Sequence, residues 1–414
     1  MLAEIITIGD ELLIGQVVDT NSAWIATLLN ENGIKVHQIT SVSDNKDHII
    51  KALDDATKRV DVILMTGGLG PTRDDITKNT LCEYFKVKLR FDAEVLKDVE
   101  HIFKIRGREV TDINKKQAEI PENCKPLRNT NGTAPGMWFE EKGKVYVSMP
   151  GVPYEMKALM TTEVIPLLKK KFTLPVILHK TVLTQGIGES MLAEKIEAWE
   201  DSLAKDNIKL AYLPSAGMVR LRLSVSGTDA KALKLLVDKK VQELIPLAEN
   251  HIYGYDKETL EGVVGKLLQE RKKTISTAES CTGGYIAHLL TSVAGSSDYF
   301  KGSVIAYAND IKVRQLDVKA ESIEKHGAVS QQVVEEMAKS VAKKMQTDYS
   351  IAVSGIAGPS GGTPDKPVGT VWIAIKTPTK VISRRFQFGD NRERNIHVTG
   401  ITALSLLRKE ILAV

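Results

Sequence analysis

Cysteine, aromatic residues and long apolar segments are all scarce in this sequence of 414 residues. Its three cysteines, Cys82, Cys124 and Cys281, are too few and too widely spaced for a disulfide framework or a metal site built from cysteine pairs. No apolar run reaches the roughly 20 residues that a helix needs to cross a bilayer. The first residues also lack the basic and apolar parts of a signal peptide. We therefore expect a cytoplasmic protein that has no membrane partner.

An excess of charge of one sign is also missing. Lysine and arginine number 56, and aspartate and glutamate number 52, which leaves a formal net charge of +4. Nucleic-acid binding relies on a concentrated basic surface, commonly with aromatic side chains for stacking, and aromatic residues make up only 5% of the chain. We expect no nucleic-acid partner. A hydrophobic share of 43% and a charged share of 26% are typical of a globular protein, here of about two to four domains.

The order of strand-like and helix-like segments predicts three domains of α/β and α+β type. Residues 1–170 alternate the two kinds of segment, which indicates a three-layer domain around a mostly parallel sheet. Residues 171–254 form a smaller α+β unit without a catalytic cluster. We interpret it as a linker or assembly domain and expect a homodimer. Residues 255–414 have the pattern of a second α/β domain.

A glycine-rich loop follows a buried strand in the first domain. It spans Thr66–Asp75 and contains Gly67, Gly68 and Gly70, which let the backbone approach a ligand and turn N–H groups toward phosphate oxygens. Arg73 adds a bidentate phosphate donor. The loop therefore predicts a phosphate-binding site.

Acidic residues stand beside this loop. Asp74 and Asp75 end it, and Asp10 and Glu11 follow the first strand of the domain. Because the carboxyl ends of parallel strands meet at one edge of a sheet, we expect these carboxylates to hold a divalent cation such as Mg²⁺ beside a phosphate. The plain structural alternative is that the glycines form tight turns and the acids cap helices.

The sharpest motif of the last domain is Thr277-Ala-Glu-Ser-Cys-Thr-Gly-Gly, a predicted strand-to-helix turn. In such a turn, backbone N–H groups and the helix dipole stabilise an oxyanion and increase the acidity of a nucleophile. Three side chains qualify as that nucleophile: Ser280, Cys281 and Thr282. The expected oxyanion donors are the N–H groups of Thr282, Gly283 and Gly284.

A base for this nucleophile lies after the next predicted strand, residues 302–307. A cysteine normally needs a histidine base, which no nearby loop offers, whereas a serine can be activated by a neutral lysine. Lys312 is available for that role, and Tyr307 could relay a proton or orient the lysine. The structural alternative is that Ser280 caps a helix and Cys281 fills a small buried space.

A second glycine-rich loop, Ser354–Gly362, lies between two predicted strands of the same domain. Backbone groups at Gly355, Ala357 and Gly358 could cradle a phosphate or support a ribose. A plain flexible connection would have a similar composition.

Three motifs of the first domain together resemble a known family. Gly9-Asp-Glu-Leu-Leu-x-Gly, Thr66-Gly-Gly-Leu-Gly-Pro-Thr-x-Asp-Asp and Pro150-Gly-Val-Pro-x-Glu-Met are similar to the MoaB/MogA-like molybdopterin-binding domain, in the version that opens CinA proteins. This resemblance implies a metal-dependent pyrophosphatase, using Mg, Mn or Co, that converts ADP-ribose to AMP and ribose 5-phosphate. The glycine loop and Arg73 would neutralise the charge that develops on the diphosphate.

The last domain resembles the C-terminal domain of the same family. The motifs are Ala278-Glu-Ser-Cys-Thr-Gly-Gly, Tyr307-x-Asn-x-x-Lys and Ser354-Gly-Ile-Ala-Gly-Pro. The resemblance implies a cofactor-free deamidase that converts nicotinamide mononucleotide (NMN) to nicotinic acid mononucleotide and ammonia. It assigns Ser280 as nucleophile, Lys312 as base and Tyr307 as an assisting group. One departure, Asn391 before Arg392, leaves the phosphate-binding roles of Arg392 and Arg394 open.

Together the two resemblances imply a bifunctional hydrolase of pyridine-nucleotide salvage. Two other functions stay open. One is a molybdopterin- or nucleotide-binding transferase, which only the first domain supports. The other is a non-catalytic binding protein related to competence, which the family name suggests and no residue pattern supports.

Overall fold

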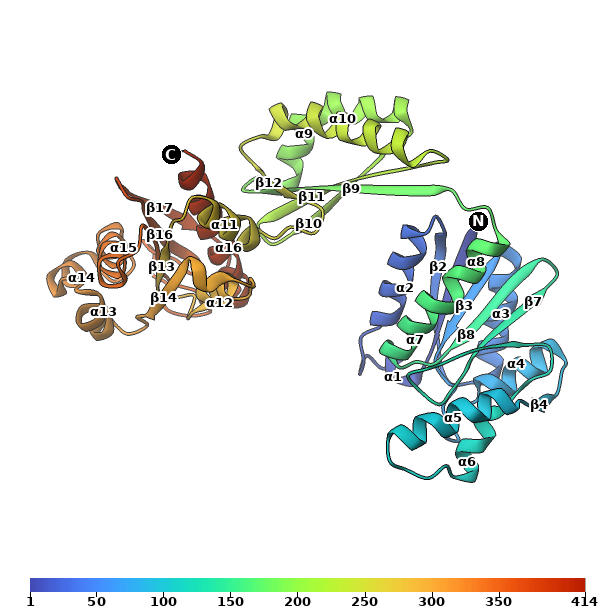
Figure 1. Cartoon of the computed structure of the whole chain (residues 1–414). Helices are drawn as coiled ribbons and strands as arrows, with labels where there is room; N and C mark the ends of the chain where they lie inside the picture. The colour runs from blue at the N-terminus through green and yellow to red at the C-terminus, as the bar shows by residue number, and fades with distance from the viewer. Residues whose placement is uncertain (414) are drawn as a thin grey trace. The chain divides into compact units, whose positions relative to one another are not determined.

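The computed structural model describes residues 1–413, and contacts divide this part of the chain into two compact units. The first unit is Met1–Leu178 with Ser226–Leu233, and the second is His179–Val225 with the chain from Lys234 onward. Three main sheets occur, one in each segment that the sequence predicts as a domain (Figure 1). Within the described residues, no helix is long and apolar enough to span a membrane.

The first unit is built around a six-stranded sheet with the order β2-β1-β3-β8-β7-β6. Strands β2, β1, β3 and β8 pair in parallel with one another. Strand β7 pairs antiparallel with β8, and β6 pairs antiparallel with β7. Its strands are β1 (Leu2–Ile8), β2 (Lys35–Val42), β3 (Val62–Thr66), β6 (Lys125–Leu127), β7 (Gly136–Glu141) and β8 (Lys144–Met149), with β4 (Leu89–Phe91) and β5 (Glu119–Pro121) as a separate pair. Its α-helices are α1 (Asp10–Leu13), α2 (Thr20–Glu31), α3 (Lys46–Arg59), α4 (Thr77–Phe85), α5 (Ala93–Ile105), α6 (Asp112–Lys115), α7 (Pro153–Leu159) and α8 (Ile165–Lys171).

Helices cover both faces of this sheet, as the βαβα pattern predicts. Neighbouring residues on a strand point to opposite faces, so Ile5 packs with α2, α7 and α8 while Ile6 packs with α3 and α4. Figure 1 shows the two groups of helices on either side of the strands. The result is the predicted three-layer domain.

Side-chain caps fix where several helices begin. Asn45 accepts hydrogen bonds from the first-turn N–H groups of α3, and Asp19 does the same for α2. In the second unit, Thr259 and Ser330 cap α11 and α15.

Residues 176–255 form a four-stranded sheet of order β10-β11-β9-β12, in which β10 pairs antiparallel with β11 and β12 pairs antiparallel with β9. Its elements are β9 (Val176–Gln185), α9 (Glu189–Leu203), β10 (Lys209–Ser215), β11 (Met218–Gly227), α10 (Ala230–Ala248) and β12 (Ile252–Tyr255). Along β11, Leu221 and Leu223 are buried while Arg220 and Arg222 are exposed, so one face of the sheet is solvated.

The rest of the second unit is an α/β domain around a five-stranded sheet of order β14-β13-β15-β16-β17. Strands β14, β13 and β15 pair in parallel. Strand β16 pairs antiparallel with β15, and β17 pairs antiparallel with β16. The strands are β13 (Ile275–Glu279), β14 (Phe300–Ile305), β15 (Tyr349–Gly355), β16 (Thr370–Lys376) and β17 (Val381–Gln387). The α-helices are α11 (Leu260–Glu270), α12 (Tyr285–Thr291), α13 (Asn309–Leu316), α14 (Ala320–His326), α15 (Gln331–Met345) and α16 (Arg392–Leu412).

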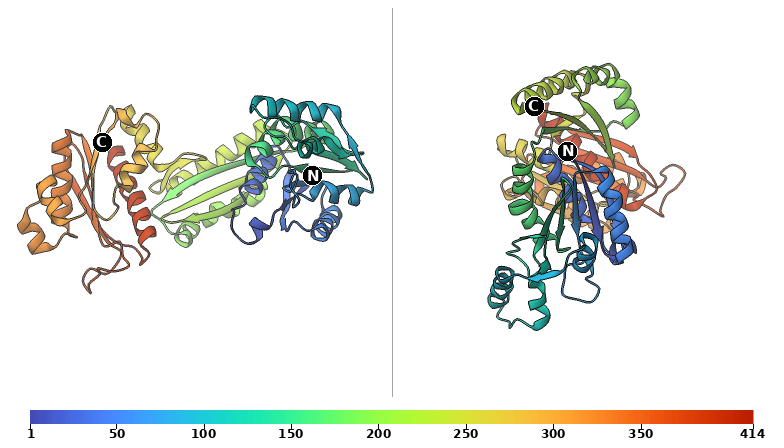
Figure 2. Two further views of the ribbon diagram at one scale, coloured as in Figure 1. Left: turned by 90° about the horizontal axis from the view of Figure 1, so that it is seen from below. Right: turned by 90° about the vertical axis from the view of Figure 1, so that its right-hand side faces the viewer.

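Helix α15 packs on one face of this sheet, and α11 and α16 pack on the other (Figure 2). The core on the α16 side also includes Leu183 and Tyr253 from the antiparallel sheet, so the second and third predicted segments share one hydrophobic core. The strand predicted over residues 302–307 ends at Ile305, which leaves Tyr307 in the loop that follows.

Candidate active sites

Three loops converge at one edge of the last sheet because its central strands are parallel. Ser280 follows β13, Tyr307 follows β14 and Gly355 ends β15. The C-terminal edge of neighbouring parallel strands is where open α/β sheets bind ligands. The structure therefore brings together the groups that the sequence predicts as nucleophile, base and substrate loop.

Ser280 and Lys312 form a buried pair at this edge. The Lys312 ammonium nitrogen lies 3.0 Å from the Ser280 hydroxyl oxygen. Lys312 also donates to the carbonyls of Ala306, at 2.9 Å, and Tyr307, at 3.1 Å. Only 1% of Lys312 and 7% of Ser280 is exposed, so solvent hardly competes for this contact. This contact is compatible with the predicted pairing of a serine nucleophile and a lysine base.

The surroundings of Lys312 favour its neutral form. Burial lowers the pKa of Lys312 below its ordinary value, and the neighbouring Cys281 opposes only part of this effect. A carbonyl can accept a hydrogen bond from a neutral amine as well as from an ammonium, so both backbone contacts survive deprotonation. A neutral amine at this position is within reach of the Ser280 proton.

Cys281 is poorly suited to act as nucleophile. Burial raises the pKa of its thiol to about 12, and the nearby carboxylate of Glu279 adds to the rise. Nucleophilic cysteines have the opposite property, a thiol pKa lowered by a cationic or dipolar environment. The side chain packs within the hydrophobic core instead, in agreement with the structural alternative for this residue.

Glu279 organises the turn, and its role is not visible in the sequence pattern. Its carboxylate is fully buried and accepts hydrogen bonds from the Thr282 hydroxyl at 2.7 Å and from the N–H of Gly284 at 3.1 Å. Two further N–H groups, of Ile286 at 3.1 Å and Ala287 at 2.8 Å, also donate to it. These bonds hold the start of α12 and fix the turn that carries Ser280.

Two of the three N–H groups predicted to stabilise an oxyanion already donate hydrogen bonds within this turn. The N–H of Gly284 donates to Glu279, and the N–H of Gly283 donates to the Ser280 carbonyl at 3.1 Å. Ser280 itself donates its N–H to the Val353 carbonyl. Within the described chain, the backbone N–H groups of Cys281 and Thr282 have no backbone acceptor. Of the predicted donors only Thr282 stays available, and Cys281 N–H joins it.

Arg392 reaches the site from the first turn of α16. Its guanidinium donates to the Tyr307 hydroxyl at 2.9 Å and to the Gly358 carbonyl at 2.9 Å. Tyr307 is 59% exposed and uses its carbonyl, rather than its ring hydroxyl, to hold Lys312. Arg394 is also exposed, and its backbone N–H bonds to the helix cap Asn391. The structure thus places Arg392, which the sequence left open, beside the predicted site.

The loop after β15 is shaped by packing. A side chain on Gly355 would come within 2.7 Å of Val371 and 3.1 Å of the Cys281 sulfur, so only glycine fits there. The carbonyls of Ala357 and Gly358 accept hydrogen bonds from Asn395 and Arg392. These residues support the loop at the site edge, with Arg392 as its cationic group.

The first unit has a second candidate site at the matching edge of its sheet. Loops after β1, β2, β3 and β8 surround a cavity of about 430 Å³. Gly67, Gly68 and Gly70 line it, as the sequence predicts. Gly67 has a φ of 117°, and a side chain there would collide with the Ile8 carbonyl, so the glycine is needed for this close approach.

The acids around this cavity differ in part from those predicted. Glu11, Asp74 and Asp75 line the cavity, and so does Asp44, which the sequence analysis does not identify. Asp10 lies just outside the lining. Its backbone N–H donates to the Asp44 carboxylate, and the backbone N–H of Asp44 donates to the Asp10 carboxylate. Burial raises the pKa of Asp44 above its ordinary value, and the charges of Asp10, Glu11 and Asp74 raise it further.

No ready-made metal-ligand group of three or more acidic, histidine or cysteine side chains occurs among residues 1–413. One reason is that the Asp75 carboxylate is used inside the loop. It accepts hydrogen bonds from the backbone N–H of Thr72, at 2.9 Å, and from the Thr72 hydroxyl. The four predicted carboxylates therefore do not form a ligand set by themselves. A Mg²⁺ ion held by one or two carboxylates together with substrate phosphates fits these residues, because it would offset the repulsion around Asp44.

Other polar groups of this cavity also escaped the sequence analysis. Glu155 is buried and accepts a hydrogen bond of 2.6 Å from Asn129. Gln117 is 4% exposed, and both polar atoms of its amide are buried without a partner in the described chain. Arg73, the predicted phosphate donor, is exposed and stands outside the lining. An unpaired buried amide at a cavity wall indicates a polar ligand or ordered water.

Comparison with known proteins assigns a family to each segment in turn. Residues 4–170 match a probable molybdopterin binding domain, residues 179–254 the damage-inducible protein CinA KH domain, and residues 257–411 the CinA C-terminal domain. A CinA-like protein from Cytophaga hutchinsonii is 50% identical over 409 residues, which cover 99% of this chain and 98% of that protein. The chain belongs to the CinA family.

Further CinA relatives agree with this assignment. A CinA-like protein from Flavobacterium psychrophilum is 53% identical over 417 residues, covering 100% of this chain and 99% of its own. Among solved structures, a competence/damage inducible protein from Agrobacterium tumefaciens is 38% identical, covers 36% of this chain and 92% of its own, and has a TM-score of 0.36. The family models and the two CinA-like relatives confirm the resemblance to CinA and to its MoaB/MogA-like domain.

The middle segment is the part whose type the sequence analysis did not predict. KH domains that clamp nucleic acid do so with a Gly-x-x-Gly loop. In residues 179–254 no two glycines are separated by two residues, so this CinA KH domain lacks that loop. The expectation of no nucleic-acid partner remains a prediction.

Proposed function

We propose that the last domain hydrolyses the carboxamide of NMN and releases ammonia. The observation that carries this proposal is the buried contact between Lys312 and Ser280, at 3.0 Å. A lysine with a lowered pKa beside a serine hydroxyl is suited to acyl transfer. The resemblance of the motifs to the CinA C-terminal domain supplies the substrate class, a nucleotide carboxamide.

The proposed reaction has two stages. The neutral Lys312 amine takes the Ser280 proton as the serine oxygen bonds to the amide carbon, and the N–H groups of Cys281 and Thr282 stabilise the resulting oxyanion. The carbon–nitrogen bond then breaks, and the lysine returns the proton to the leaving nitrogen, which departs as ammonia. Water, deprotonated by Lys312, cleaves the serine ester to give the acid product and free Ser280.

Arg392 is the proposed anchor for the substrate phosphate. Its guanidinium lies beside the site, presents a fixed fork of donors, and contacts Tyr307 and Gly358 rather than a carboxylate. Binding at the phosphate would leave the carboxamide as the part of the substrate that faces Ser280.

The test of this function is ammonia release from NMN by the full chain in EDTA. Ser280→Ala should abolish release, and the same variant should hydrolyse ADP-ribose as the wild type does. Absence of ammonia release from a folded wild-type protein would refute the deamidase.

For the first domain we propose metal-dependent hydrolysis of ADP-ribose to AMP and ribose 5-phosphate. Support comes from the cavity, whose wall combines three glycines with Glu11, Asp44 and Asp74. A bound divalent ion would supply charge neutralisation for the diphosphate and an activated water. The glycine backbone would bind the diphosphate, and Asp44 and Asp74 would share in holding the ion.

This second activity is tested by hydrolysis of ADP-ribose with added Mg²⁺, Mn²⁺ or Co²⁺. Asp74→Asn should lower it while NMN deamidation is unchanged, with Asp112→Asn, an exposed acid in the same domain, as the matched control. Tight pterin binding without ADP-ribose turnover would favour the transferase alternative instead.

A further inference from the structure

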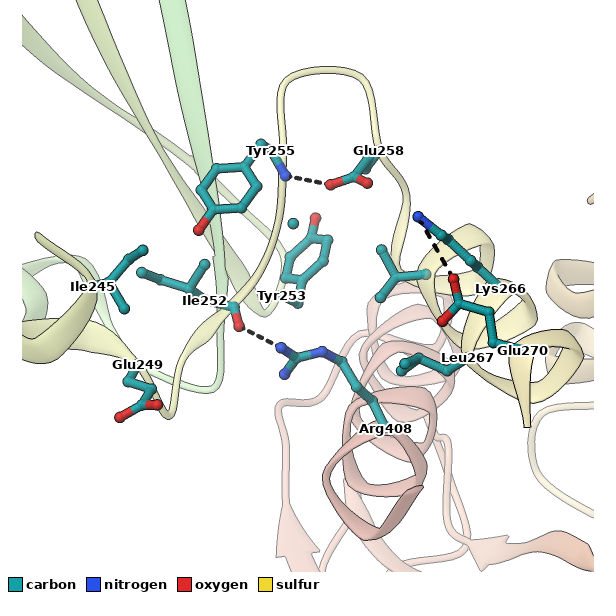
Figure 3. A pocket seen from close by; sticks show the side chains of 12 residues that line it. Ile245, Glu249, Ile252, Tyr253, Tyr255, Glu258, Lys266, Leu267, Glu270 and Arg408 are labelled. Carbon is teal, nitrogen blue, oxygen red and sulfur yellow. Dashed lines mark hydrogen bonds and ion pairs between the residues drawn. The ribbon is translucent and has the colours of Figure 1, made fainter. Parts of the chain in front are cut away.

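The second unit contains a cavity of about 390 Å³ that is separate from the Ser280 site. It lies where β12 and the end of α10 face α11 and α16 (Figure 3). Apolar side chains form much of its wall: Ile245, Ile252, Tyr253, Val263 and Leu267. This size and this apolar wall are typical of a pocket for a small organic molecule.

Arg408 of α16 is one of the two cationic groups of the cavity, beside Lys266. One terminal nitrogen of its guanidinium donates to the Ile252 carbonyl at 2.8 Å, as Figure 3 shows. Its Nε atom is buried without a hydrogen-bond partner in the described chain. No carboxylate among residues 1–413 forms an ion pair with Arg408, and burial lowers its pKa. Arg408 is half-buried, and a guanidinium that is partly removed from water gains from an anionic partner, which is missing among the described residues.

The other charged groups of the cavity are already engaged or lie at its rim. Glu258 accepts a hydrogen bond of 2.7 Å from the N–H of Tyr255, and Glu270 lies 3.9 Å from Lys266. Glu249 is exposed. With three glutamates against Lys266 and Arg408, the lining opposes a doubly charged anion more strongly than a singly charged one. A single negative charge matches the one unpaired guanidinium.

We propose that this cavity binds a small monocarboxylic acid with a planar apolar body. Its carboxylate pairs with Arg408, and its ring packs against Tyr253 and Leu267. Arginine binds carboxylates through charge-assisted hydrogen bonds, and the apolar walls gain from covering a ring. The site involves no residue of the Ser280 reaction and does not depend on that proposed function.

The probe is benzoate, titrated by calorimetry into the full-length protein, with benzamide as its neutral analogue and phenyl phosphate as a doubly charged one. We expect one saturable benzoate site, and about tenfold or more weaker binding of both analogues. Lys239→Met, on an exposed lysine of α10 outside the cavity lining, is the control and should leave benzoate affinity within about threefold of the wild type.

Two independent variants test the location. Arg408→Met should weaken benzoate binding about tenfold or more. Leu267→Trp should block the cavity while retaining the arginine, which keeps the test decisive where the first variant unfolds. Ser280→Ala should bind benzoate as the wild type does. Absence of saturable benzoate binding at millimolar concentration, or unchanged binding in Leu267→Trp, would overturn the proposal.

Discussion

Replacing Lys312 by methionine separates a catalytic from a structural role for this buried side chain. Methionine has a similar length and volume but neither charge nor donor. The change removes three hydrogen bonds, to Ser280 and to the carbonyls of Ala306 and Tyr307. It also removes an amine whose charged form is disfavoured by burial.

The stability terms nearly cancel, whereas the catalytic terms do not. Each carbonyl left without a donor costs about 1–3 kcal/mol when buried. Loss of a buried amine offsets this cost, because burying an ammonium is itself unfavourable by several kcal/mol. We expect the free energy of unfolding to change by less than about 2 kcal/mol. Loss of a general base lowers kcat about 10²–10⁴-fold, which corresponds to roughly 3–5 kcal/mol.

The assay is ammonia release from NMN, measured beside thermal unfolding of the same preparations. Lys301→Met, on an exposed lysine of β14, is the matched control and should retain activity.

The wild-type pH profile adds an independent check. The neutral base is populated above the lowered pKa of Lys312, so kcat/KM should rise with pH and level off below 10.5. Between the lowered folded-state pKa of Lys312 and 10.5, this lysine is protonated in the unfolded chain and neutral in the folded one. It therefore makes stability rise with pH in this range, and the rise should be smaller in Lys312→Met than in the wild type. A folded Lys312→Met variant with activity within about threefold of wild type would refute the base assignment.

Three further predictions follow from the two sites. Cys281→Ala should deamidate NMN within about threefold of wild type, because a thiol with a pKa raised to about 12 contributes no thiolate at neutral pH; loss of activity with unchanged stability would reinstate Cys281 as nucleophile. Glu279→Gln should lower both the unfolding temperature and kcat, since it leaves N–H donors of the Ser280 turn unpaired, while KM changes less; an unaltered kcat would show that the turn holds without the carboxylate. Mg²⁺ should lower the raised pKa of Asp44 in a carboxyl NMR titration, and an unchanged titration curve would place the ion elsewhere.

Sequence reasoning identifies the Ser280 and Lys312 pair because its parts follow strands of one parallel sheet. The end of β13 and the end of β14 must meet at one edge, whatever the exact strand bounds are. The same logic brings the glycine loop after β3 to the acids after β1 in the first domain. Such predictions depend on topology, which the alternation of elements reveals.

The groups that were missed depend on tertiary burial instead. Glu279 looks like an ordinary acid between Ala278 and Ser280, and only the fold shows that α12 turns its N–H groups onto it. Asp44 stands alone before a capping asparagine, so no cluster marks it in the sequence. Assignment of the oxyanion donors to residues 282–284 failed for a related reason, since it ignored that Glu279 and the Ser280 carbonyl already use two of those N–H groups.

The two candidate sites occupy the same position on their sheets but gather opposite charges. The first brings Glu11, Asp44 and Asp74 to the edge, whereas the second brings Lys312 and Arg392. A site lined by carboxylates repels a diphosphate unless a cation accompanies it. The second site carries its own positive charge on Arg392, while burial favours the neutral form of Lys312. The proposed activities should therefore respond differently to a chelator: EDTA should stop ADP-ribose hydrolysis and leave NMN deamidation intact. Equal loss of both activities in EDTA would mean that the second site also relies on a metal, against the charges that the structure places there.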